Sequence, residues 1–226
     1  PVPPPVAGDP GPVDSDVRNP DGADDSAVSG SRTRTRTVTC IRPGDGELVA
    51  EILAVEGDED PGEAEELQAD GQRRSSSREG CDGWESARFS RDGARVYLES
   101  RYTCRGGVER RSTGVFSLVS PWEWLDVRSV ESGGEVRTWT RRYQRVPAEQ
   151  VERAELREWA EVEEELAVET ARIALSGPPS LDDIIEASNR VHGDAVVAWL
   201  AEEGDPVPVD GDALLGLADA GVPGTV

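Results

Sequence analysis

Lysine, methionine and long apolar runs are absent from this chain of 226 residues. All 24 basic residues are arginine, and histidine occurs once, as His192. A lone histidine at a predicted turn provides no base for a serine or cysteine nucleophile. The chain also contains no GxSxG, GxxxxGK[ST], GxGxxG, HExxH or CxxC pattern, so it lacks the signatures of serine hydrolases, P-loop and Rossmann proteins and common zinc sites. We therefore expect a non-enzymatic protein without a cofactor.

Positive charge is also scarce, since the chain has 46 acidic and 24 basic residues and a formal charge of -22. A surface of this sign repels nucleic acid and anionic lipid headgroups, so we expect a protein partner and no nucleic acid. No apolar run approaches the ~20 residues of a membrane-spanning helix, and we expect no membrane span. The acidic run at Asp58 and Asp60 places Gly62 on the fifth position of an EF-hand loop instead of the sixth. This spacing argues against a calcium site, and we expect no metal.

Composition divides the chain into four parts. Residues 1–31 are rich in Pro, Gly, Ser and Asp and carry few apolar side chains, so we expect a disordered acidic tether. The start PVPPPVAGDP is typical of a spacer that follows a removed signal peptide, and we expect export from the cytoplasm. Residues 32–146 have β signals, 147–177 a helical period, and 180–226 an internal repeat. The predicted fold class is α+β.

The β domain, residues 32–146, combines alternating polarity, β-branched residues and closely spaced turn signals. These features predict an antiparallel meander that forms a small barrel or a curved sheet. Residues 47–55 fit either a strand or a short helix, and residues 56–80 read as a mobile acidic loop. The other predicted strands cover 33–41, 84–90, 94–104, 108–119, 122–131 and 135–146.

Asp92-Gly93 marks the clearest hairpin. With these two residues as a type I′ loop, paired residue numbers sum to 185, and Phe89 lies opposite Val96 on one apolar face. The motif FSRDGARVY (89–97) resembles the TolB-type propeller repeat, which is itself a strand, turn and strand. A propeller needs several copies of about 40 residues, and the chain contains one. The resemblance therefore implies a sheet hairpin and no propeller.

The same register places Cys81 directly opposite Cys104. Opposed Cα atoms in an antiparallel pair lie about 4.5–5.5 Å apart, which suits a disulfide. We predict this disulfide, and it favours an extracytoplasmic location. Cys40 is then the odd cysteine, with burial as a small apolar side chain and an intermolecular bond as its two alternatives.

Helical signals dominate after residue 146. Residues 147–177 begin with proline, end at Gly177-Pro178-Pro179 and carry one apolar stripe, which predicts a long amphipathic helix. Residues 180–226 contain a helix-turn-helix unit that repeats at an offset of 30, and the second copy stops at Val226. We expect the native chain to continue beyond this point. Residues 212–226 resemble a short helical repeat motif of uncharacterised exported bacterial proteins.

Two functions are compatible with this layout. The first is an exported interaction or structural module that binds a protein partner, or a second copy, through a sheet edge or the helical tail. Residues 81–146 hold 12 arginines and 9 acidic residues while 147–226 hold 4 and 19, so the two parts are complementary for docking within or between chains. The alternative is a β-barrel-like protein that binds a small apolar or sugar ligand, with aromatic residues as candidate contacts: Trp122, Trp124, Trp139, Phe89 and Tyr102.

Overall fold

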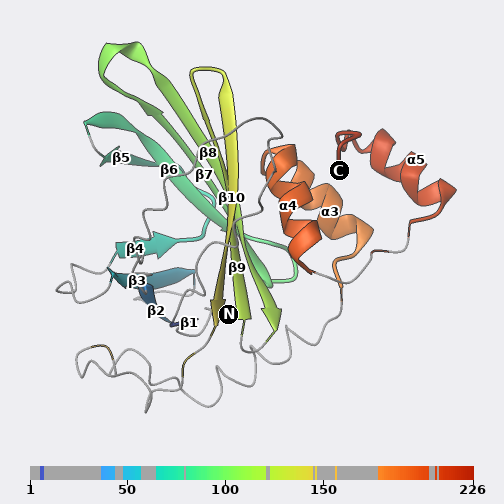
Figure 1. Ribbon diagram of the computed structural model, residues 1–226, viewed down its shortest axis with the longest axis horizontal. Coiled ribbons are helices and arrows are strands. Elements are labelled where there is room, and N and C mark those ends of the chain that lie inside the picture. Colours follow the sequence, from blue (N-terminus) through green and yellow to red (C-terminus); the bar gives the residue numbers. More distant parts are fainter. Residues whose placement is uncertain are drawn as a thin grey trace, which may run out of the picture.

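The computed structural model describes residues 6–7, 37–43, 48–56, 65–78, 80–120, 123–144, 178–203 and 209–226, together with residues 146, 156 and 207. The predicted tether and long helix lie outside the described residues, apart from Val6–Ala7 and Leu156. The fold is α+β, as predicted, with an antiparallel meander followed by helices (Figure 1).

A six-stranded antiparallel sheet forms the centre of the molecule. Each strand pairs with its neighbours in the sequence, so the order in space is β10-β9-β8-β7-β6-β5. Alternation places one set of side chains on each face, as in any pleated sheet. The strands are β5 (Arg74–Arg78), β6 (Cys81–Phe89), β7 (Arg95–Thr103), β8 (Glu109–Ser120), β9 (Glu123–Ser132) and β10 (Glu135–Gln144).

The hairpin of β6 and β7 has the predicted register, with Phe89 opposite Val96. Its connection is longer than the predicted two-residue loop. Ser90 donates its backbone N–H to the Arg95 carbonyl, and its own carbonyl accepts from Gly93 N–H. Gly93 has a φ of 76°, which glycine adopts without strain. The loop differs by an even number of residues from the predicted one, so the register and the apolar face are unchanged.

A smaller sheet has the order β1-β2-β3-β4. Its third strand settles the ambiguity over 47–55 in favour of a strand. The predicted loop over 56–80 is wrong at residues 65–68 and 74–78, which form β4 and β5. The strands are β1 (Val6–Ala7), β2 (Thr37–Pro43), β3 (Val49–Glu56) and β4 (Glu65–Gln68).

The two sheets approach one another at both edges. Strand β4 contacts β6, and β1 contacts β10. An isolated bridge between Asp70 and Arg88 adds a further link beside β6. The pair of sheets therefore encloses a space from two sides. The outer face of the small sheet is also covered, since the buried Leu156 packs against Leu53 and Val55 of β3.

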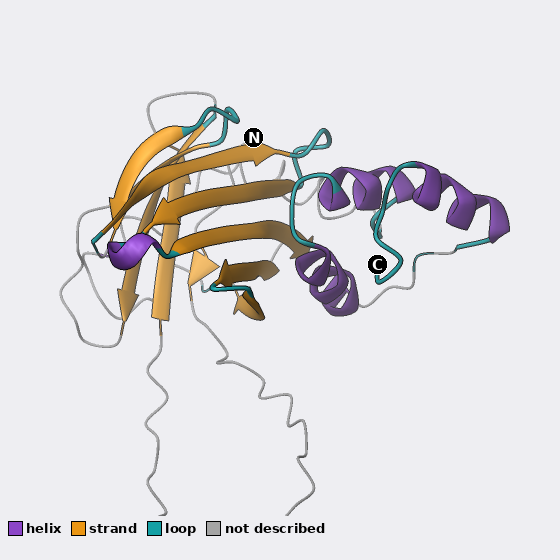
Figure 2. Cartoon of the chain, turned by 90° about the horizontal axis from the view of Figure 1, so that it is seen from above, coloured by secondary structure: helices purple, strands orange, loops and turns teal. Residues whose placement is uncertain are grey.

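The C-terminal helices are α3 (Leu181–Ser188), α4 (Gly193–Glu203) and α5 (Gly211–Asp219). The repeat is visible in their caps, because Ser180 and Asp210 each accept a hydrogen bond from the backbone N–H three residues on. Helix α4 packs on β8, β9 and β10, while α3 contacts α4 and α5 and adds Ala187 to the core. Figure 2 shows the helices gathered at one end of the molecule.

The main core lies between α3, α4 and the large sheet. Trp199 is fully buried there against side chains of β7, β8 and β9. Two ion pairs flank this core: Arg95 with Asp183 at 3.2 Å, and Arg142 with Glu202 at 2.9 Å. The acidic helices thus dock on arginines of the sheet within one chain. Tyr97 is consequently buried beneath the helices. In the described part of the chain, no helix is long and apolar enough to span a membrane.

Candidate functional site

A cleft of about 630 Å³ lies between the two sheets. One wall is the face of the large sheet that points away from α3 and α4, and the other wall comes from β3, β4 and the turns beside them. The face is set by alternation, since Tyr97 and Val115 point toward the helices while Val96 and Phe116 line the cleft.

The base of the cleft is apolar. Residues of β6, β7 and β8 that are adjacent across the sheet supply most of it, because Val96 pairs with both Phe89 and Phe116. Residues of the small sheet close the space from the opposite side. The apolar lining consists of Leu48, Ile52, Leu67, Ala69, Ala87, Phe89, Val96, Leu98, Phe116 and Tyr143.

Two serines form a polar row further along the same strands. Ser100 of β7 pairs directly with Ser112 of β8, and Glu85 of β6 is the other neighbour of Ser100. All three side chains line the cleft. Both serines are half-buried. Their hydroxyl groups make no hydrogen bond within the described structure, so they are open to a molecule in the cleft.

Tyr102 lies two residues beyond Ser100 on the same face of β7, beside this polar row, and is 7% exposed. Its hydroxyl donates to Glu85 and lies 3.0 Å from Ser76 Oγ. Burial, together with the hydrogen bond to Glu85, raises the pKa of the Tyr102 hydroxyl. Tyr102 is therefore a neutral donor at physiological pH, and it orients the Glu85 carboxylate at the edge of the cleft.

Most arginines of the lining form ion pairs with nearby carboxylates. Arg78 contacts Glu65 of β4 at 3.1 Å and Glu85 of β6 at 3.0 Å, which links the two walls. Burial lowers the pKa of Arg78, but the hydrogen bond to Glu65 and the charge of Glu85 outweigh it and raise the pKa overall. Arg128 pairs with Asp126 on the opposite side of the cleft. The lining is therefore close to neutral, in contrast to the chain as a whole.

Arg74 belongs to the same border of the cleft. Its guanidinium makes two hydrogen bonds to the Asp70 carboxylate, at 2.9 and 2.7 Å. The hydrogen bond from Arg74, with a further one from Gln72 N–H, lowers the pKa of Asp70 to about 2. This fixed turn joins β4 to β5 and so connects one sheet to the other.

Of the five predicted ligand contacts, Phe89 lines the cleft. Trp124 is 4% exposed and stacks on Phe116 with ring centroids 4.8 Å apart, so it packs beside Phe116 on the same face of the sheet but does not itself line the cleft. Tyr102 is buried beside the cleft, as described above. Trp139 lies on β10 and is 38% exposed, outside the lining. Trp122 lies outside the described residues.

Sequence reasoning missed the residues of β3 and β4 and most of the polar row. Ile52, Leu67 and Ala69 were assigned to a segment of uncertain structure or to a loop. Phe116 and Ser112 were placed on a strand but not on a face. Phe116 and Ser112 can be assigned to the cleft face from the cross-strand register of β7 with β8. That register depends on the length of the loop between the two strands.

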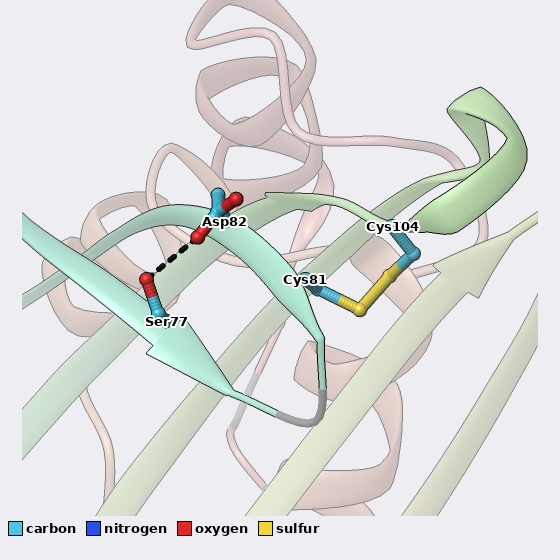
Figure 3. Close-up of a disulfide and its surroundings, with 4 residues drawn as sticks. All are labelled: Ser77, Cys81, Asp82 and Cys104. Atoms are coloured by element: carbon cyan, nitrogen blue, oxygen red, sulfur yellow. Dashed lines mark hydrogen bonds between the residues drawn. A yellow bond between two sulfur atoms is a disulfide. The ribbon is translucent and has the colours of Figure 1, made fainter.

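The predicted disulfide is confirmed (Figure 3). Cys81 and Cys104 are joined with an S–S distance of 2.06 Å and a Cα–Cα distance of 4.0 Å. The bond closes the end of the β6–β7 hairpin, and Ser77 donates a hydrogen bond to Asp82 beside it at 2.7 Å. The backbone of Cys40 pairs with Leu53, and its side chain lies outside the described structure.

The described residues contain no candidate metal site. Among the described residues, no group of three or more His, Cys, Asp or Glu side chains is placed to hold an ion. His192 lies before α4, where its backbone N–H donates to Thr113 Oγ1 and its Nδ1 accepts from Asp194 N–H. Its role in the described structure is thus to join the α3–α4 turn to the sheet.

Comparison with known proteins gives one solved structure. No family model matches the chain, and no curated protein matches it. The similar structure is secretory abundant heat soluble protein 4 from Ramazzottius varieornatus, with a TM-score of 0.37, 14% sequence identity, and coverage of 50% of this chain and 71% of that one. At this level of similarity the comparison carries no argument about the function of the chain.

Proposed function

We propose that the chain is a non-catalytic, extracytoplasmic binding protein that holds a small, largely apolar molecule in the cleft between its sheets. The observation that carries the proposal is the cleft of about 630 Å³ with an apolar base. Sites for small molecules are concave, span roughly 300–1,000 Å³ and combine apolar walls with a few placed polar groups. The inter-sheet cleft has each of these properties.

The extracytoplasmic location is supported by the Cys81–Cys104 disulfide. Such bonds form and persist in oxidising compartments and are rare in the cytosol. Fractionation of cells that express the natural protein tests this part. Recovery in the cytoplasmic fraction, with both cysteines open to alkylation, would contradict it.

Binding is tested with the neutral fluorophore N-phenyl-1-naphthylamine, whose emission rises in apolar surroundings. Leu98 lines the cleft and is half-buried, so Leu98→Trp fills part of the space without opening a cavity. We expect at least a fivefold loss of affinity for the fluorophore. Val108→Trp is the matched control, because Val108 is 46% exposed and lies outside the cleft.

Circular dichroism and thermal unfolding establish that both variants are folded. Equal binding by wild type and Leu98→Trp would show that the fluorophore binds elsewhere, and no binding by the wild type would remove the support for a ligand site.

Self-association through the helical tail is the second candidate, and one observation favours it. Leu214 and Leu215 of α5 are 60% and 66% exposed. Their counterparts in the first repeat are Ile184, which is 3% exposed, and Ile185, which is half-buried. A second copy could cover the two leucines in the same way. Sedimentation of the wild type and of Leu214→Ser/Leu215→Ser tests this, with a monomer in both cases as the contradicting result.

A further inference from the structure

The lining of the cleft changes from apolar to polar along the strands of the large sheet. Across β6, β7 and β8, one row of neighbours consists of Phe89, Val96 and Phe116. Four residues along β7, the row that contains Ser100 is polar. At about 3.3 Å per residue, the two rows are about 13 Å apart. A ligand that lies along the strands therefore meets an apolar region at one end and hydroxyl groups at the other.

From this gradient we propose that the ligand is a neutral single-chain amphiphile, a molecule with one aliphatic chain and an uncharged head that bears hydroxyl groups. The proposal rests on the proposed function of the cleft as a ligand site. The chain would lie against Val96, Phe116 and Ile52, and the head would lie at Ser100 and Ser112.

The hydroxyl-bearing head follows from the donors and acceptors at the polar row. Ser100 and Ser112 hydroxyl groups each offer a donor and an acceptor, and neither makes a hydrogen bond within the described structure. The adjacent Glu85 carboxylate accepts from Tyr102 and Arg78, and it has lone pairs for one further donor. Groups that both donate and accept match this set, and hydroxyl groups do so without a charge.

The absence of charge on the head follows from the ion pairs of the cleft. Arg78 is held by Glu65 and Glu85, and Arg128 is held by Asp126. Arg74 is held by Asp70. A carboxylate head would have to displace one of these acids from its arginine, and a cationic head would have to displace an arginine. An uncharged head leaves every pair intact.

A free sugar fits the cleft less well than a molecule with an aliphatic chain. Sugars stack on exposed aromatic faces, and the ring of Phe116 is already stacked against Trp124 at 4.8 Å. Trp139 lies outside the lining. The remaining apolar wall is mainly aliphatic, with Ile52, Leu67 and Leu98.

Calorimetric titration of the whole chain with three probes tests the proposal. They are 1-octanoylglycerol, sodium octanoate and glycerol, each below any aggregation concentration. We expect 1-octanoylglycerol to bind, octanoate to bind at least tenfold more weakly, and glycerol to give no heat. Octanoate that binds as tightly as 1-octanoylglycerol would overturn the neutral head and leave the proposed function standing. Failure of all three probes together with the fluorophore would overturn both.

The head contact is tested by Ser100→Ala/Ser112→Ala. Loss of two hydrogen bonds to the ligand should lower the affinity for 1-octanoylglycerol about tenfold. Fluorophore binding should be unchanged, which shows that the cleft is intact. Thr103→Ala is the matched control, since Thr103 lies on β7, is exposed and points away from the cleft. An unchanged affinity of the double variant for 1-octanoylglycerol would place the head elsewhere.

Discussion

Removal of the Cys81–Cys104 disulfide should destabilise the chain by about 3 kcal/mol. The bond joins residues 23 positions apart, and in the chain-entropy account a closed loop of this size restricts the unfolded chain by about that amount. A loss of about 3 kcal/mol corresponds to a fall of about 6–12 °C in the melting temperature of a domain of 150–250 residues. Since the bond acts on the unfolded state, the slope of the unfolding free energy against urea should also increase.

The assay is urea unfolding followed by tryptophan fluorescence, comparing Cys40→Ala with Cys40→Ala/Cys81→Ala/Cys104→Ala. The shared Cys40→Ala change prevents exchange between thiols. Cys40→Ala alone serves as the control for loss of a cysteine without loss of the bond. A difference below about 1 kcal/mol between the two variants, with equal urea slopes, would refute the loop-closure reasoning.

Three further predictions concern packing, pH and backbone space. Trp199→Ala should cost about 3–5 kcal/mol in urea unfolding, because Trp199 is 0% exposed in the main core; a cost below about 1 kcal/mol would contradict the assigned core. The pKa of Asp70 is lowered from 3.8 to about 2, so its ion pair stabilises the fold above about pH 4 and is lost as the pH falls toward 2. Asp70→Asn should remove that part of the pH dependence of the unfolding midpoint, and an unchanged pH profile would argue against the pair. Gly83→Ala should destabilise by about 1–3 kcal/mol, because its Cβ would lie 1.9 Å from the Arg101 carbonyl oxygen. Gly216→Ala in α5 has open space around it and should be neutral or stabilising by up to about 1 kcal/mol; equal effects of the two glycine changes in thermal unfolding would contradict this account.

The fold class, the disulfide and the β6–β7 register could be predicted because each depends on a local pattern. Phe89 and Val96 identify one face, and the sum of paired residue numbers then brings the two cysteines together. The turn type was not needed, since the observed loop keeps the same parity. The adjoining hairpin differs in this respect. Gly106 and Gly107 would predict a two-residue loop, but Cys104 N–H donates to the Val108 carbonyl, and three residues form the connection. A two-residue loop would have moved Phe116 to the wrong face.

Strand β4 of the small sheet and strand β5 at the edge of the large sheet could not be predicted, for a different reason. Residues of β4 and β5 have little apolar character: EELQ and RSSSR show no pattern of a buried strand. These strands are held by backbone pairing and by ion pairs such as Arg78–Glu65, which join segments 13 residues apart. Hydrophobic periodicity identifies strands that bury apolar side chains in a core. A strand held by ion pairs and backbone pairing has no such period, and its sequence resembles that of a polar loop.

The shape and composition of β5 bear on the behaviour of the protein in concentrated solution. Strand β5 ends the large sheet, and within the described part of the chain it pairs with β6 alone. Its backbone groups on the free side are a potential template for a strand of another molecule. The strand is five residues long, has arginine at both ends and serine between them, and offers no apolar side chain to a newcomer. Such an edge disfavours the addition of strands from other molecules, which is the first step of fibril growth. Ser75→Val/Ser77→Val should therefore raise the rate of aggregation at high protein concentration.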